Sequence, residues 1–421
     1  MSPLSNEPSV PPAPAHSASV ALEGEESVDR RGAGTYLFTM PWDLGSIGGV
    51  SQVVAALMEE LRSLGSLTPA LLVNSWEDQE PREVPAGDLR QVFMRVRPLL
   101  EASRQNLSSL LRYALLVPRE LLRIRRFVRA ERVSVVNAHF PTTALFTWFL
   151  ARAFGGPRFK IVMSLHGLEI RSTFERRGLE RWLWSWMLRR ADAVVACSNG
   201  LQDEIEQAYG LPANIVRTIH NGIDPRNIGR IRSRAREAPV TDRPYLCNVG
   251  TFEPKKAHDV LLQAFAIVAE QQKNLDLVMI GRRGETSAAT RTLIEELGLG
   301  SRVRMLEDMP HAETLAAIDG SRAFVLASRV ESFAIVLLEA GALGKAVVAT
   351  QICGVEELLE DGRTGRLSPP EDPATLAQTV LDVIEDEPAA EALGRSLREH
   401  VDEHFSWHRA ARAYLDVVGH A

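Results

Sequence analysis

Two carboxylates stand out in the stretch AFVLASRVESFAIVLLEAGALGKAVVAT, which runs from residue 323 to residue 350. Glu331 follows a short apolar run, and Glu339 is the only charged residue between Ser332 and Gly344. An isolated carboxylate among apolar residues costs several kcal/mol unless something pairs with it. One interpretation is an ion pair with a neighbouring Arg or Lys, or a position on the rim of a helix. The other is a pair of acidic groups in a functional site.

The residues around the two carboxylates predict a strand, a helix and a second strand. Residues 323–328 and 346–350 are short apolar runs typical of buried strands, and residues 333–343 suit a helix that ends at Gly344. Such a unit aligns its two strands in parallel within one sheet. Glu331 is then expected in the loop that leaves the first strand, directly before the helix begins.

Strands alternate with helices along most of the chain. This alternation predicts two parallel sheets, each covered by helices on both faces. The first series of apolar runs comprises residues 35–40, 69–74, 91–94, 133–139, 159–165, 193–197 and 215–219, and the second begins at 245–249, 275–281 and 303–306.

The predicted organisation has five parts. Residues 1–31 are rich in Pro, Ser, Ala and Glu and are expected to form a disordered tail, because they hold hardly any large apolar side chains. The remaining parts are an N-terminal domain (32–224), an Arg-rich interdomain linker (225–241), a C-terminal domain (242–400) and an amphipathic C-terminal helix (401–421).

Polar residues and glycines fall at or just beyond the predicted strand ends, where open α/β sheets bind their ligands. Glycines between the strand at 35–40 and the next helix let the backbone approach a ligand and offer N–H groups to an anion. If the two domains face each other, all of these residues line one cleft. They are Gly48, Gly49, His139, His166, Asn221, Lys256, Glu331 and Ser332.

The spacing Glu331-x7-Glu339, in the context ESFAIVLLEA, resembles the E-x7-E signature of retaining glycosyltransferases of family 4. The resemblance extends over nearly the whole chain after the first thirty residues. It implies the GT-B fold, in which two Rossmann-like, doubly wound domains face each other across a cleft and the C-terminal helix crosses back to the first domain. It also implies that Glu331 acts beside the donor sugar and that Glu339 binds the ribose.

The resemblance assigns further residues to a sugar-nucleotide site. GTFEPKKAHDVLLQAF is similar to the phosphate loop GRLxxxKG of the family, so Lys256 falls on the lysine that binds the diphosphate. Thr251 stands where the family has Arg, and Lys255 is a candidate for the missing charge. His166 matches the histidine that reaches the donor sugar, while His139 and Asn221 are acceptor-side candidates. The expected donor-binding set is Gly48, Gly49, Lys255, Lys256, Ser332, Phe333, Ala334, Ile335 and Glu339.

The implied activity is retaining transfer of a hexose from a nucleotide sugar to a saccharide or lipid-linked acceptor in polysaccharide or glycoconjugate biosynthesis. No cofactor and no metal are expected, since no DxD-type motif occurs in a suitable loop. Two alternatives remain open: another GT-B enzyme such as a nucleotide-sugar epimerase, and a non-catalytic partner in a polysaccharide assembly complex.

Charge and composition bear on location and partners. Three scattered cysteines, the absence of a signal-peptide pattern and the lack of a long apolar run predict a cytoplasmic protein. Residues 91–190 hold 19 basic and 6 acidic residues, although the whole chain has a net charge of −6. The segment RWLWSWMLRR places Trp182, Trp184 and Trp186 among arginines, either as core residues or as a contact with an anionic membrane. No nucleic-acid motif accompanies this charge.

Overall fold

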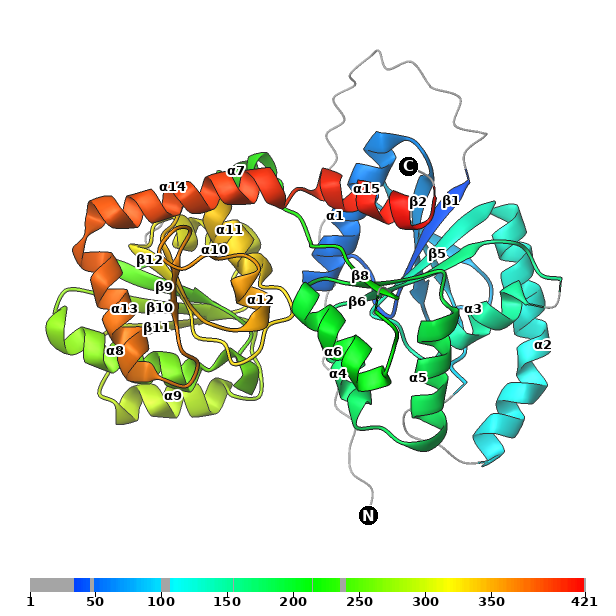
Figure 1. Ribbon diagram of the computed structural model, residues 1–421, viewed down its shortest axis with the longest axis horizontal. Coiled ribbons are helices and arrows are strands. Elements are labelled where there is room, and N and C mark those ends of the chain that lie inside the picture. Colours follow the sequence, from blue (N-terminus) through cyan, green and yellow to red (C-terminus); the bar gives the residue numbers. More distant parts are fainter. Residues whose placement is uncertain are drawn as a thin grey trace, which may run out of the picture. The chain divides into compact units, whose positions relative to one another are not determined.

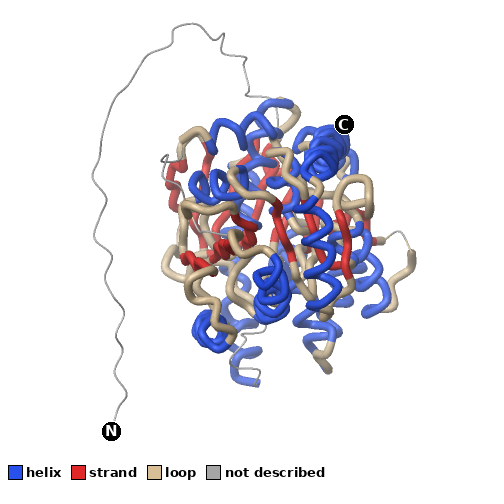
Figure 2. The backbone as a smooth tube through the Cα atoms, turned by 90° about the vertical axis from the view of Figure 1, so that its left-hand side faces the viewer, coloured by secondary structure: helices blue, strands red, loops and turns tan. Residues whose placement is uncertain are grey.

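The computed structural model of the protein describes residues 34–45, 49–99, 107–153, 155–213, 215–234 and 240–419. The tail predicted at residues 1–31 and the candidate Gly48 therefore lie outside the described residues. The strands form two separate sheets, and helices pack on both faces of each sheet (Figures 1 and 2).

The first sheet has the strand order β3-β4-β2-β1-β5-β6-β7-β8. All neighbouring strands pair in parallel except the edge pair β3–β4, which is antiparallel. The edge strand β3 was not predicted, because its residues are largely exposed and lack an apolar run. The strands are β1 (Thr35–Met40), β2 (Thr68–Asn74), β3 (Arg82–Ala86), β4 (Leu89–Met94), β5 (Val133–His139), β6 (Lys160–Leu165), β7 (Ala193–Ala196) and β8 (Val216–Thr218).

Helices follow the strands of this sheet and bury one apolar face each. In the first helix, Val53, Val54, Leu57, Met58 and Leu61 are buried, which is the spacing of a single helical face. The helices are α1 (Gly49–Leu64), α2 (Leu107–Ala130), α3 (Leu145–Arg152), α4 (Leu168–Phe174), α5 (Gly178–Arg190) and α6 (Asn199–Tyr209).

The second sheet is parallel throughout, with the strand order β11-β10-β9-β12-β13-β14. Its central strands are fully buried, as their continuous apolar runs predict. The strands are β9 (Tyr245–Val249), β10 (Asp276–Gly281), β11 (Val303–Glu307), β12 (Ala323–Leu326), β13 (Val347–Thr350) and β14 (Arg366–Ser368). The elements around them are the 3-10 turn η2 (Pro254–Lys256) and helices α8 (His258–Gln271), α9 (Ser287–Glu296), α10 (His311–Asp319), α11 (Ile335–Ala342), α12 (Cys353–Glu356) and α13 (Pro373–Glu385).

The segment expected to be a linker, residues 225–241, contains a helix. Helix α7 (Pro225–Arg232) starts at the N-cap Asp224, whose carboxylate accepts a hydrogen bond from the backbone of Arg226. Ile228 is buried, and Arg232 pairs with Asp319 of α10 at 2.6 Å. The Arg-rich composition hid this helix because a single buried Ile gives little apolar periodicity.

The C-terminal helix starts later than predicted. Helix α14 (Glu387–His404) continues past residue 400, and the separate helix α15 (Trp407–Val417) then packs on α1 of the first sheet (Figure 1). Between them, the carbonyl oxygen of Phe405 accepts a hydrogen bond of 2.8 Å from the backbone N–H of Ile223. Tyr414 and Leu415 of α15 are buried in the core that α1 also enters.

The tryptophan-rich helix α5 is mainly a packing element. Trp184 is buried, and the ring of Trp186 makes edge contacts with Phe146 and Phe149 of α3. Only Trp182 is largely exposed, at 54%. A membrane contact through all three rings is therefore excluded, because Trp184 belongs to the core.

Candidate functional site

An ion pair joins two loops at the C-terminal edge of the second sheet. Nζ of Lys256, at the end of η2, lies 2.5 Å from Oε1 of Glu331. The same carboxylate oxygen accepts a hydrogen bond of 2.7 Å from the hydroxyl of Ser328. The two charged side chains are only 17% and 9% exposed, so each depends on the other for charge compensation. Because β9 and β12 are neighbours in the sheet, the loops that follow them bring the pair together.

The residues on either side of Lys256 explain why its side chain is the one that reaches Glu331. Ala257 has a φ of 49°, a left-handed conformation that an alanine rarely adopts and that usually marks a position the surrounding structure constrains. The side chain of Lys255 pairs with Glu253 at 2.8 Å instead of joining Lys256. Lys256 is thus the lysine of this loop that reaches Glu331.

Glu339 lies on α11 and has a partner that the sequence did not indicate. Its Oε1 lies 2.8 Å from Nε2 of His311, the first residue of α10. This hydrogen bond to a carboxylate raises the pKa of His311 above its usual value, although burial opposes the shift. His311 also lies just beyond a strand, β11, so the rule that sites form at strand ends was the signal that could have found it.

The loop that precedes α11 meets a loop from the first sheet. Gly167 has a φ of 119°, and a Cβ atom there would clash with the hydroxyl of Ser332. Nη1 of Arg171 donates a hydrogen bond of 2.8 Å to the same hydroxyl, and a bidentate pair with Glu204 fixes the guanidinium. Arg171 and Glu204 were not predicted, since a polar residue within a helix gives no sign of its partner.

Two of the remaining donor-side candidates, Phe333 and Ala334, have buried side chains. Phe333 stacks on the ring of His220 and contacts Phe405, and Ala334 is buried. Their side chains therefore serve packing, and only their backbone groups remain for a ligand. Ile335 begins α11 and lies beside Gly49, which begins α1; its Cδ1 is 3.8 Å from where a Cβ of Gly49 would stand.

The two candidate histidines of the first sheet form a direct pair. Nδ1 of His139, at the end of β5, lies 3.0 Å from Nε2 of His166, which follows β6. Burial lowers the pKa of His166 to about 4, and burial together with His166 lowers the pKa of His139 well below its usual value. Both imidazoles are therefore neutral near pH 7, and one nitrogen of the pair must donate to the other.

The surroundings of His139 indicate which nitrogen donates. Its Nε2 is buried and has no hydrogen-bond partner within the described part of the chain. A buried N–H without an acceptor is costlier than an unused lone pair, so the proton of His139 is favoured on Nδ1. His166 then accepts through Nε2 and carries its own proton on Nδ1. His166 is thereby presented as a hydrogen-bond donor of fixed tautomer.

Asn221 lies in the loop after β8, and its neighbour His220 makes the contacts of that loop. Nε2 of His220 lies 2.8 Å from Oε2 of Glu357, and the same carboxylate accepts hydrogen bonds from the backbone N–H groups of Asn199 and Gly200. Burial opposes the ionisation of Glu357, but these hydrogen bonds outweigh it and lower its pKa. The segment HNGID signalled the loop, whereas the acidic partner from the other half of the chain had no sequence signal.

The structure thus brings several of the predicted residues into direct contact: Lys256 with Glu331, Gly167, which follows His166, with Ser332, and Gly49 with Ile335. Lys255 and the side chain of Phe333 point elsewhere. Among the described residues, no group of three or more His, Cys, Asp or Glu side chains is arranged to hold a metal ion.

Comparison with protein families identifies two adjoining matches. The model described as "Glycosyltransferase Family 4" matches residues 47–227, and the model described as "Glycosyl transferases group 1" matches residues 229–400. Together they cover the second sheet and all strands of the first sheet except β1.

Curated relatives carry the similarity over much of the chain. A glycogen synthase of Mycobacterium tuberculosis is 29% identical over 294 residues, which are 69% of this chain and 69% of the relative. An alpha-D-kanosaminyltransferase of Streptomyces kanamyceticus is 26% identical over 389 residues, 87% of this chain and 96% of the relative.

Solved structures share the fold. A sucrose-phosphate synthase from Thermosynechococcus elongatus superposes with a TM-score of 0.71 at 21% identity, covering 92% of this chain and 100% of the other. HepE of Anabaena, in complex with UDP and glucose, gives a TM-score of 0.69 at 19% identity, covering 91% and 99%.

The ion pair of His311 and Glu339 predicts a pH dependence of stability. A raised pKa in the folded state stabilises the protein fully below the unfolded value of about 6.5, and that contribution is lost as the pH rises through the folded-state pKa. Urea unfolding measured from pH 6 to pH 9 should therefore show that wild type loses more free energy of unfolding than His311→Gln. In a Glu339→Gln background the His311→Gln change should leave the pH profile unaltered. Equal pH profiles for wild type and His311→Gln would contradict this pairing.

Proposed function

Since this chain is a glycosyltransferase of the family 4 type with the GT-B fold, we propose that it moves a hexose from a nucleotide sugar to a hydroxyl of a saccharide or lipid-linked saccharide, with retention at the anomeric carbon. The observation that carries this proposal is the ion pair of Lys256 and Glu331 at the C-terminal edge of the second sheet. A diphosphate and a sugar need a cation and a carboxylate side by side, and this pair supplies both.

Charge balance suggests how the site receives its donor. Glu331 is the counter-ion of Lys256, and a nucleoside diphosphate is a stronger one because it offers several anionic oxygens. When the diphosphate pairs with Lys256, Glu331 is freed to act beside the anomeric carbon. The N-termini of α1 and α11, which start at Gly49 and Ile335, add backbone N–H groups for the same anion.

The remaining candidates take supporting roles in this proposal. The Nδ1–H of His166 donates a hydrogen bond to a hydroxyl of the donor sugar. His139 fixes this tautomer of His166 by donating its Nδ1–H to Nε2 of His166. Glu339 binds the ribose in exchange for His311. Backbone groups of the loop at Ser332 contact the donor sugar, and Asn221 contacts the acceptor.

The names of the relatives support a sugar transferase and leave the acceptor open. HepE was solved with UDP-glucose, which supports a nucleotide-sugar donor. Similar chains are named glycogen synthase, N-acetyl-alpha-D-glucosaminyl L-malate synthase and D-inositol 3-phosphate glycosyltransferase, so their acceptors differ. Consumption of a nucleotide sugar by the purified protein separates a catalyst from a non-catalytic assembly partner, which would consume none.

We further propose that the basic N-terminal domain contacts an anionic membrane surface where a lipid-linked acceptor lies. No helix within the described residues is long and apolar enough to cross a bilayer. On α2, however, Leu111, Leu115 and Leu122 are 63%, 78% and 54% exposed among arginines, as in helices that lie on a membrane.

Vesicle sedimentation tests this contact. Leu111→Ser/Leu115→Ser should weaken binding to vesicles that contain phosphatidylglycerol, because each exposed leucine removes apolar area from the contact. Ile267→Ser, a change at another exposed apolar residue, on α8, is the matched control and should bind like wild type. Equal binding of all three proteins would dismiss the contact through α2.

Substitution of Glu331 and substitution of Glu339 should impair different kinetic parameters. Glu331→Gln should lower kcat by about 100-fold, since a charge beside the reacting carbon acts mainly on the transition state. Glu339→Ala should chiefly weaken nucleotide binding and raise KM. Steady-state kinetics and nucleotide titration distinguish the two, with the exposed Glu356→Gln as control. Wild-type kinetics in both variants would remove these residues from the site.

The leaving group needs positive charge, and in this proposal Lys256 and the helix N-termini provide it without a metal ion. Activity should therefore survive EDTA. Lys256→Ala should slow turnover by about ten- to a hundredfold, the scale of one charged hydrogen bond at about 1.4 kcal/mol per decade. Lys273→Ala, a change at an exposed lysine in the turn after α8, controls for loss of charge. Abolition by EDTA with rescue by magnesium or manganese would refute this assignment.

A further inference from the structure

A groove of about 630 Å³ runs along α2 and contains none of the residues assigned above to sugar transfer. Five of the described residues that line it are arginines, and the segment after β4 and the helix α2 supply them. They are Arg95, Arg97, Arg119, Arg123 and Arg126. A volume of this size is that of a ligand site and exceeds what a few water molecules need.

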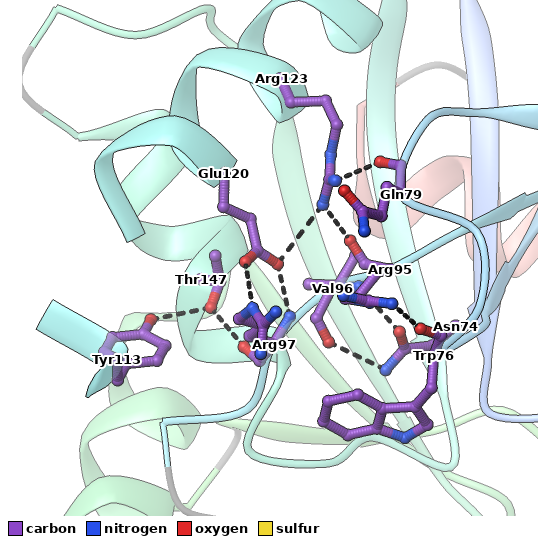
Figure 3. A network of polar contacts seen from close by, with 10 residues as sticks. All are labelled: Asn74, Trp76, Gln79, Arg95, Val96, Arg97, Tyr113, Glu120, Arg123 and Thr147. Carbon is purple, nitrogen blue, oxygen red and sulfur yellow. Dashed lines mark hydrogen bonds and ion pairs between the residues drawn. The ribbon is translucent and has the colours of Figure 1, made fainter. Parts of the chain in front are cut away.

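Three acidic residues line the groove; Glu120 and Glu131 are engaged in ion pairs, and Glu80 is exposed. Glu120 is 4% exposed and accepts a hydrogen bond of 2.5 Å from the backbone N–H of Arg97. Its carboxylate lies 3.5 Å from Nε of Arg97 and 3.7 Å from Nη2 of Arg123 (Figure 3). Glu131 pairs with Arg90 of β4, which also pairs with Glu83. Glu120 therefore compensates Arg97 and Arg123 of the groove, Glu131 compensates Arg90 outside it, and five arginines share the groove with three carboxylates.

Several N–H donors of the groove's arginines have no hydrogen-bond partner among the described residues. Arg119 and Arg126 are exposed and have no ion pair or hydrogen bond with the described residues. The Nε atoms of Arg95 and Arg123 are buried without a hydrogen-bond partner within the same part of the chain. Arg123 is otherwise held by the backbone carbonyls of Gln79 and Arg95, toward which Figure 3 shows it extended. The groove thus has more donors than acceptors.

The positions on α2 strengthen this imbalance. Arg119, Arg123 and Arg126 are spaced by four and three residues, so they follow one face of the helix. Like charges at this spacing repel each other, and an anion bound among them relieves the repulsion. Apolar side chains, Leu116 and Phe127, line the same groove and leave room for the uncharged part of a ligand.

The groove adjoins the acceptor side of the proposed active site. Arg95 and Arg97 flank Val96, which lines a small pocket next to His139. Asn74 fixes this segment, because its side chain accepts from the N–H of Val96 at 2.8 Å and donates to its carbonyl at 3.0 Å. One backbone segment therefore separates the acceptor pocket from the arginine groove.

We propose that the groove along α2 binds a phosphate or diphosphate group of the acceptor, through the guanidinium groups of Arg119, Arg123 and Arg126. Guanidinium groups bind such oxyanions in bidentate fashion. This assignment rests on the proposed function only in naming the acceptor as the carrier of the phosphate. The phosphate belongs either to a soluble sugar phosphate or to the headgroup of a lipid-linked saccharide.

Calorimetry on the full chain with saturating UDP tests the site while the donor pocket is filled. Pyrophosphate and glucose 1-phosphate are the soluble probes, and phosphatidylcholine vesicles with and without phosphatidylglycerol are the lipid probes. Arg119→Gln/Arg126→Gln should weaken phosphate binding by about tenfold or more, the effect of lost charged hydrogen bonds. Arg226→Gln/Arg230→Gln, on the exposed face of α7, is the matched control and should bind like wild type.

The pattern of losses decides the outcome. Loss confined to the soluble probes assigns a sugar phosphate, and loss confined to phosphatidylglycerol vesicles assigns a lipid headgroup; both support a phosphate site. Binding of every probe that is equal in wild type and in the Arg119→Gln/Arg126→Gln variant overturns the proposal, as does absence of binding to wild type. UDP binding, measured separately, should be the same in all three proteins, so failure of the groove is distinguishable from failure of the donor site.

Discussion

The ion pair of Lys256 and Glu331 is the contact on which the rest of the site depends. Two nearly buried charges lie 2.5 Å apart, and either one alone would be left in a poorly solvated position. Each comes from a loop after a parallel strand, and the adjacency of β9 and β12 brings those loops together. Sheet order, loop conformation and charge thus meet in one contact, and in the proposed function a diphosphate replaces Glu331 as the partner of Lys256.

Close backbone packing keeps the loops around this pair in place. A Cβ on Gly354 would clash with the carbonyl of Glu331, and one on Gly281 would clash with the carbonyl of Gly250. Gly167 approaches Ser332 equally closely from the first sheet. Gly354 and Gly281 let segments from different strands touch through their backbones, and Gly167 leaves room for the side chain of Ser332. Side chains such as Glu331 and His166 are therefore presented on rigid supports, which preorganised sites require.

The sequence predicted the features that follow from local pattern. Continuous apolar runs located the strands of both sheets except the edge strands β3 and β14, and the spacing Glu331-x7-Glu339 led to the family that the comparisons confirm. What it could not predict are the partners of polar side chains. His311 pairs with Glu339 and Arg171 donates to Ser332, which are contacts between segments far apart in sequence, whereas Lys255 pairs with Glu253 only two residues away. In each case the partner depends on the direction of the side chain, which the sequence does not give. The amphipathic pattern likewise did not predict helix α7, because Ile228 is its only buried side chain.

A crystal structure of the protein with bound UDP tests the central claim most directly. If Lys256 exchanges Glu331 for the donor, its Nζ will lie within hydrogen-bond distance of the diphosphate, and the carboxylate of Glu331 will have left the lysine and turned toward the sugar position. A bound nucleotide whose diphosphate does not contact Lys256, with the lysine still paired to Glu331, would contradict this exchange.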